Sequence, residues 1–205
     1  TSKFGGVPYI AQDAQAPVDA EGNQLALLAQ INCTELPEND IYPKEGLVQF
    51  WISRDDSFGL DSKGTNVVKY IKDIDENITN GDVLNKYHLP SEDNDEEYSP
   101  FHEKDASFAL IFSKGTSTIT ATDFLFEDVA KDAIHELFPD EQVADLYEDL
   151  DSEIYETLFK AFNGVQHAIG GYPTFVQWDP RDPDNKDAYD TMLLQIESEW
   201  DVNTK

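Results

Sequence analysis

The sequence predicts a mainly β protein of the α+β class, an internally duplicated β roll with a helical insertion between its two repeats. A Gly-Gly-x-Pro corner followed by a Leu-x-Gln-Ile strand occurs within residues 5–31 and again, 165 positions later and without a gap, within residues 170–196. Eight of the 27 aligned positions are identical, whereas average composition would give roughly one or two. Between the two copies, apolar residues recur with a helical period.

The first repeat and the segment after it contain six of the eight predicted strands. Residues 46–52 form an apolar run that is long enough for a buried strand and too short for a helix. Residues 91–105 are acidic and contain a proline, so we expect a loop that its own charges repel into solvent. The strands expected before this loop are 7–12, 25–32, 46–52 and 66–71, and a hairpin is expected from 106–112 and 117–122.

The helical insertion precedes the second repeat. Two helical periods, within 124–138 and 143–162, are separated by Pro139, which suits a helix start. Strands are expected again near 172–178 and 191–197, without a counterpart of the strand at 46–52. We expect a single domain over residues 1–205, with repeat one at about 3–72, the insertion at about 123–163 and a truncated repeat two at about 168–205.

The charge of the chain is extreme. Its 205 residues include 42 acidic and 14 basic side chains, a net charge of −28, and a surface this negative repels nucleic acid and anionic membranes. The acidity favours either a soluble surface or a basic protein partner. A salt-adapted surface is a weaker alternative, because 12 of the 14 bases are lysine.

Composition also limits the compartment and the stabilising chemistry. Hydrophobic residues make up 40% of the chain, enough for a core, and no apolar run approaches the roughly 20 residues of a membrane span. The single cysteine, Cys33, excludes an intrachain disulfide and a Cys-rich zinc site. A cytoplasmic location is therefore expected, and the oligomeric state is left open.

Two blocks of sequence carry a family resemblance. The first block comprises residues 2–9 (SKFGGVPY), 27–32 (LLAQIN) and 46–50 (GLVQF), and the second comprises 170–181 (GGYPTFVQWDPR) and 193–196 (LLQI). Together they resemble the YwqG-like family of bacterial proteins. The resemblance implies a roll-like, mainly β fold with some helix and an internal duplication, and it carries over no catalytic residue. Family members usually have a further strand after the second block, so this chain is expected to be a fragment or to complete its sheet with a partner.

Glutamines inside the apolar strands are candidate ligand-binding residues. Gln30, Gln49, Gln177 and Gln195 each lie within an apolar or aromatic run. A buried amide costs about 1–3 kcal/mol unless its hydrogen bonds are made. These amides either line a ligand pocket or bond to the backbone where strands meet.

The two arginines suggest a second kind of site. Arg54 and Arg181 are the only arginines, and each follows an aromatic strand that contains Trp51 or Trp178. Because arginine suits bidentate carboxylate recognition, an anion site beside these tryptophans is one interpretation. Salt bridges within the chain, for example with Asp179, are the alternative.

Metal and catalytic signals are weak. Aspartates in the loop 179–190 could bind Ca²⁺, but their spacing is not that of the helix–loop–helix calcium motif. His88 and His102 do not share a helix turn, so a transition-metal site is not predicted either. We expect no cofactor and no metal, and no nucleophile motif identifies a catalytic residue.

The sequence therefore favours a non-enzymatic binding or interaction module of the bacterial cytoplasm. Its sharpest form is an immunity-type protein that neutralises a basic protein. The alternative is an enzyme or small-ligand-binding protein with a site at the seam between the repeats. The residues expected at such a seam are Gln30, His167, Asp179 and Arg181.

Overall fold

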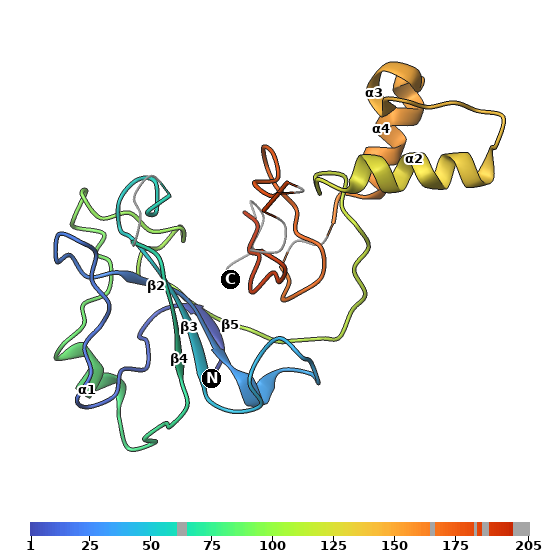
Figure 1. The fold of residues 1–205 in the computed structure, drawn as a ribbon. Coiled ribbons are helices and arrows are strands. Elements are labelled where there is room, and N and C mark those ends of the chain that lie inside the picture. Colours follow the sequence, from blue (N-terminus) through green and yellow to red (C-terminus); the bar gives the residue numbers. More distant parts are fainter. Residues whose placement is uncertain (61–64, 165–166, 183, 186–188, 199–205) are drawn as a thin grey trace. The chain divides into compact units, whose positions relative to one another are not determined.

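A computed structural model describes residues 1–60, 65–164, 167–182, 184–185 and 189–198. The chain divides into two compact units, Thr1–Lys114 and Gly115–Lys205. The N-terminal unit contains the sheet, and the C-terminal unit contains the longer helices (Figure 1).

The N-terminal unit is built on a five-stranded antiparallel sheet of order β4-β3-β2-β1-β5. A 3₁₀ turn at Cys33–Glu35 follows the second strand, and a short helix, α1, spans Asn80–Leu84. The strands are β1 (Lys3–Gly5), β2 (Ala26–Asn32), β3 (Leu47–Ile52), β4 (Val67–Ile71) and β5 (Ser107–Ala109). This architecture confirms the sheet-rich α+β class and the strands predicted at 25–32, 46–52 and 66–71.

The centre of the sheet is apolar because β2 and β3 carry the longest apolar runs of this unit. Leu27 lies opposite Trp51 in the β2–β3 ladder, and both are buried. The Trp51 ring meets Tyr87 edge-on at a centroid distance of 5.9 Å, and Val83 of α1 belongs to the same core cluster. These side chains are apolar because they are buried in the core, and this is why the apolar run of β3 was sufficient to predict the strand.

The predicted strand at 7–12 is wrong. Gly5 and Gly6 both have positive φ, +60° and +66°, so the chain turns directly after β1, at a conformation that glycine adopts without the steric cost of a Cβ. The paired strand is β1, Lys3–Gly5, three residues long. The segment that follows it forms no ladder and makes its hydrogen bonds to side chains instead.

The predicted hairpin of 106–112 with 117–122 is also wrong. β5 (Ser107–Ala109) pairs with β1, more than 100 residues earlier, with Phe108 opposite Phe4. Residues 117–122 form no strand. β5 therefore pairs with a strand distant in sequence and not with the neighbouring segment, and sequence spacing alone gives no sign of this pairing.

One edge of the sheet is formed by β4. Val68 and Tyr70 of this strand are 54% and 46% exposed, and Lys69 lies between them. Within the sheet of the described residues, β3 is the neighbour of β4 on one side and no strand follows on the other.

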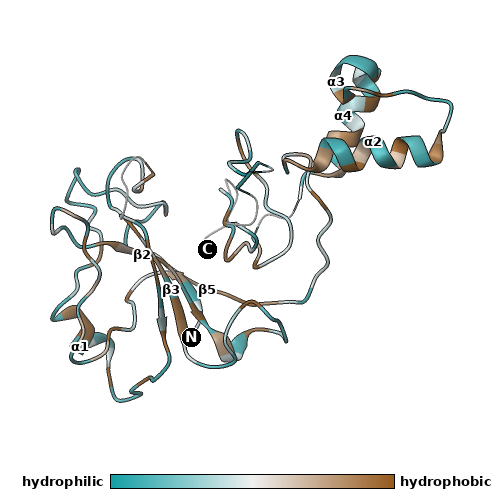
Figure 2. Ribbon diagram, in the orientation of Figure 1, coloured by the Kyte–Doolittle hydropathy of each residue, from teal (hydrophilic) through white to brown (hydrophobic). Residues whose placement is uncertain are grey.

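The C-terminal unit contains α2 (Phe126–Leu137), α3 (Leu146–Asp149) and α4 (Ser152–Ala161), within the two predicted helical ranges. The buried Phe126 ring of α2 packs against Phe159 and Phe162 at centroid distances of 5.6 and 5.4 Å. Figure 2 shows that α2 alternates hydrophilic and hydrophobic residues along its length. Among the described helices of both units, none is long and apolar enough to cross a membrane.

The strands predicted at 172–178 and 191–197 do not form as strands. The described backbone there has a single isolated bridge, between Ala168 and Gln195. Gln195 is half-buried, and the N–H of each bridge residue donates to the carbonyl of the other. A single bridge holds two chain segments together without the ladder that a strand requires.

The bridge in the C-terminal unit nevertheless has a counterpart in the sheet. Lys3 pairs with Gln30 in the β1–β2 ladder, and both residues lie 165 positions before Ala168 and Gln195. The glycines after each bridge, 5–6 and 170–171, all have positive φ. These matching features support the predicted duplication, which stays a prediction.

Candidate functional site

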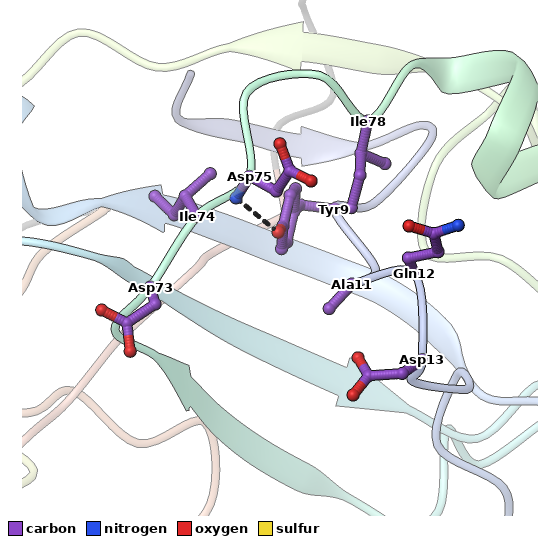
Figure 3. A pocket seen from close by; sticks show the side chains of 8 residues that line it. All are labelled: Tyr9, Ala11, Gln12, Asp13, Asp73, Ile74, Asp75 and Ile78. Carbon is purple, nitrogen blue, oxygen red and sulfur yellow. Dashed lines mark hydrogen bonds between the residues drawn. The ribbon is translucent and has the colours of Figure 1, made fainter.

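A groove of about 720 Å³ opens beside the sheet in the N-terminal unit (Figure 3). It lies between two segments: the one after β1 and the one after β4. Its lining residues are Tyr9, Ala11, Gln12, Asp13, Asp73, Ile74, Asp75 and Ile78.

Tyr9 is held in this groove by the predicted glutamines. The Tyr9 backbone N–H donates to Gln30 Oε1 at 2.8 Å, and Gln49 Nε2 donates to the Tyr9 carbonyl at 2.7 Å. Gln49 Nε2 also donates to Gln30 Oε1 at 2.9 Å, and Trp51 Nε1 donates to Gln49 Oε1 at 3.2 Å. Both amides are nearly completely buried, so this network meets their hydrogen-bonding needs and fixes the backbone on which the Tyr9 ring stands.

The other end of the Tyr9 side chain is also fixed. Its hydroxyl accepts a hydrogen bond from the Asp75 backbone N–H at 2.9 Å (Figure 3). The Asp75 carboxylate accepts from the backbone N–H and side-chain amide of Asn77 at 2.9 and 2.8 Å. These bonds lower the pKa of Asp75 below its ordinary value, so this wall of the groove keeps its negative charge.

Lys86 supports the opposite wall. Its ammonium group donates to the carbonyl oxygens of Ala11, Gln12 and Ala14, the last two at 3.2 and 3.1 Å. A lysine that satisfies three carbonyls in a turn stabilises the path of that segment. Asp13, at the tip of the turn, is exposed.

The groove is negative around an aromatic ring. Asp13, Asp73 and Asp75 supply three exposed carboxylates, and none of the eight described lining residues is basic. The tyrosine ring offers a face that attracts cations. In the described part of the chain, no three His, Cys, Asp or Glu side chains are placed to hold a metal ion. Carboxylates around an aromatic ring form a site that suits a cationic group.

Arg54 is buried at the end of β3. Its side chain is 7% exposed, and its guanidinium donates to Glu97 Oε1 at 3.0 Å, to the His88 carbonyl at 2.7 Å and to the Leu25 carbonyl at 3.4 Å. It also stacks over the Tyr87 ring at 5.5 Å. This geometry ties the acidic loop, through Glu97, to the end of β3.

Arg181 has the same kind of environment in the C-terminal unit. It donates to Asp179 Oδ2 at 2.7 Å and to Asp123 Oδ2 at 2.6 Å, and both aspartate side chains are 2% exposed. Phe124 and Phe175 flank its guanidinium at 5.2 and 5.9 Å. Both arginines therefore form salt bridges within the chain, Arg54 with Glu97 and Arg181 with Asp123 and Asp179.

The remaining candidates belong to the C-terminal unit. Gln195 Oε1 accepts from the Thr174 backbone N–H at 2.7 Å. Trp178 is 74% exposed. Gln177, expected inside an apolar strand, is exposed and outside any strand, because the strand predicted around it does not form.

The structure thus brings Gln30, Gln49 and Trp51 together beneath Tyr9. Sequence reasoning missed the residues that line the groove. Tyr9 directly follows the Gly-Gly-x-Pro corner, a position that could have drawn attention to it. Asp73 and Asp75 gave no signal, because acidic residues are a fifth of the chain.

The sheet, the groove and the helices define a sheet-rich α+β protein. Residues 2–205 match the family described as "Domain of unknown function (DUF1963)". The chain belongs to this family, which spans nearly all of it. No curated protein matches the chain significantly.

Proposed function

We propose that this protein is a non-enzymatic binding module that takes up a cationic side chain of a basic protein partner in the groove around Tyr9. The observation that carries the proposal is the lining: three carboxylates around one aromatic ring, with no basic residue among the described lining residues. The most specific version of this proposal is an immunity-type role, in which the protein neutralises a basic protein. The YwqG-like resemblance is part of the same proposal, since it implies a roll-like fold and carries over no catalytic residue.

Known magnitudes fit recognition by several weak contacts. A cation over an exposed tyrosine ring gains about 0.5–1 kcal/mol, and an exposed ion pair about 0.2–1 kcal/mol. These terms select a cation without giving tight binding by themselves. The net charge of −28 adds long-range attraction, which raises the association rate of a basic partner and weakens with salt.

The groove is preorganised for this role. Tyr9 is fixed at its backbone by Gln30 and Gln49 and at its hydroxyl by Asp75. A ring held in place loses little conformational entropy when a ligand binds against it. The amide network beneath the groove therefore supports binding without touching the ligand.

The test is a titration of the full chain with a synthetic tetralysine peptide at low and at high salt. Binding is monitored by NMR, through the backbone amide signals of the protein. We expect the largest shifts in the segments of Tyr9 and Asp75, and weaker binding in an Asp13→Asn/Asp73→Asn variant. The matched control is Asp93→Asn/Asp95→Asn, which removes the same charge from the exposed acidic loop. Equal weakening in both variants would mean that only net charge matters, and the groove would then not be the binding site.

A further inference from the structure

Helix α4 carries apolar side chains on two faces. One face is covered within the C-terminal unit, where Phe159 meets Phe126 and Tyr155 at centroid distances of 5.6 and 4.5 Å. The other face is formed by Ile154, Leu158 and Ala161. These positions are spaced i, i+4 and i+7, so they form one stripe along the helix.

The stripe lies in a shallow, open hollow of the surface, and the described residues that line it all belong to α4 or to its N-cap, Asp151. Ile154 is 58% exposed, whereas isoleucine in a packed core is nearly completely buried. The rim is acidic, since Asp151 and Glu153 line the hollow at the start of the helix. The six described lining residues are Asp151, Glu153, Ile154, Thr157, Leu158 and Ala161.

The helices around this hollow are strongly negative. Between Phe126 and Ala161 the chain has twelve acidic residues and two lysines. Both lysines are already paired: Lys131 Nζ lies 3.2 Å from Glu127 Oε1, and Lys160 Nζ lies 3.0 Å from Glu156 Oε2. The acidic rim therefore has little positive charge of its own to balance it.

We propose that the stripe of Ile154, Leu158 and Ala161 docks a basic amphipathic helix of a partner protein. The apolar face of such a helix would cover the stripe, and its lysines or arginines would meet Asp151 and Glu153. This is packing of one helix against another, in which apolar side chains at helical spacing on both helices give the contact area. The surface differs from the Tyr9 groove, and its occupation does not depend on that groove.

Charge separates this occupant from a second copy of the chain. A second copy would bring the same twelve acids and two lysines to the contact. Like charges placed across an interface cost free energy and reject the partner. A basic amphipathic helix, in contrast, would bury the apolar stripe and also form favourable charge pairs with the acidic rim.

The test uses the full chain and a fluorescein-labelled 18-residue helical peptide of leucine and lysine with one apolar face. The comparison peptide has the same composition, scrambled so that no apolar face forms. We expect saturable binding of the amphipathic peptide in fluorescence anisotropy, with NMR shifts centred on α4. Ile154→Ser/Leu158→Ser should weaken binding about tenfold or more, because each substitution removes the burial of a large apolar side chain.

The matched control is Val129→Ser, which removes another exposed apolar side chain from the same acidic helices and should leave binding unchanged. Circular dichroism checks that each variant retains its helices. Glu153→Gln, which leaves the stripe intact, is a second variant that should bind the peptide more weakly. Equal binding of the scrambled peptide, or shifts centred outside α4, would overturn the proposal. So would a dimer in sedimentation equilibrium that Ile154→Ser/Leu158→Ser dissolves, because the stripe would then belong to a second copy.

Discussion

The backbone N–H of Tyr9 donates a 2.8 Å hydrogen bond to the side chain of Gln30, and this bond attaches the segment after β1 to the middle of the sheet. The same arrangement occurs 165 residues later, where the Thr174 N–H donates to Gln195 at 2.7 Å. In both cases a glutamine side chain replaces the backbone partner that a strand would have supplied. The segments after the two glycine corners thus run beside the chain without joining a ladder.

Gln30→Leu should destabilise the N-terminal unit by about 1–3 kcal/mol, because it leaves the partly buried N–H of Tyr9 and one buried donor of Gln49 without an acceptor. Urea unfolding gives the change in free energy, and hydrogen exchange should show faster exchange of the Tyr9 amide. Gln142→Leu, at an exposed position, is the control and should stay within about 0.5 kcal/mol of the wild type. Unchanged protection of the Tyr9 amide in Gln30→Leu would contradict the role given to this bond.

Gly6→Ala should be more damaging than Gly22→Ala, although both glycines have positive φ, +66° and +91°. A Cβ at Gly6 would lie 2.6 Å from Ser107 Cβ, whereas a Cβ at Gly22 meets nothing within 4 Å. Gly22→Ala therefore reports only the backbone cost, about 1–2 kcal/mol.

The melting temperatures of these variants measure the difference. Ser107→Gly removes the atoms that a Cβ at Gly6 would meet most closely, so Gly6→Ala/Ser107→Gly should recover part of the loss. If the second substitution recovers nothing, the steric account of the corner is wrong and the cost lies in the backbone alone.

The pairing of Arg54 with Glu97 should make stability depend on pH. Burial alone would raise the pKa of Glu97, but the N–H of Ser91 and the charge of Arg54 outweigh it and lower the pKa. The unfolded state binds the proton more readily, so the pair contributes stability above the unfolded pKa of about 4.3. That contribution is lost as the pH falls through the lower folded pKa.

Glu97→Gln tests this dependence by urea unfolding between neutral and acid pH. We expect the variant to be less stable than the wild type at neutral pH, and the gap to narrow as the pH falls below about 4.3. Other carboxylates titrate in both proteins, so the gap isolates Glu97. A gap that stays constant over this range would show that the ion pair contributes no pH-dependent stability.

Arg181→Met should unfold the region around Asp123 and Asp179, because it leaves two nearly buried carboxylates without their cation. Breaking a buried pair in this way costs about 3–5 kcal/mol. The pKa of Asp179, which hydrogen bonds and the charge of Arg181 lower against the effect of burial, should rise. Hydrogen exchange of the Phe124 amide, which donates to Asp179 at 3.1 Å, gives a local readout.

Asp179→Asn/Arg181→Met is the companion variant to Arg181→Met. It removes one of the two carboxylates together with the cation, so it should be less destabilised than Arg181→Met alone. The opposite order would indicate that Asp179 stabilises this region without Arg181.

The sequence was a good guide to elements that bury a continuous apolar run. β3, with Leu47, Val48, Phe50 and Trp51, is buried along nearly its whole length, and the run alone predicted it. The helical ranges followed from periodicity in the same way. These features depend on residues close together in the chain, which a single sequence can reveal.

Long-range contacts were the main source of error. β5 pairs with β1 across the whole N-terminal unit, and the two glycines after β1 shorten that strand to three residues. Around the groove, the sequence singled out Gln30 and Gln49 as amides inside apolar strands, and both are buried. Tyr9 and the aspartates around it were missed, because a groove is made by segments that fold together and acidic residues are common everywhere in this chain.

The edge strand β4 has a consequence for the handling of this protein. Val68 and Tyr70 are exposed on a strand that has a neighbour on one side only within the described sheet, an arrangement that invites two copies to pair edge to edge. Near neutral pH the net charge of −28 keeps the copies apart. As the pH approaches the isoelectric point of about 4.1 this repulsion disappears, and β4 becomes the place where aggregation would begin. The acidity of the chain thus acts as colloidal protection for this edge strand.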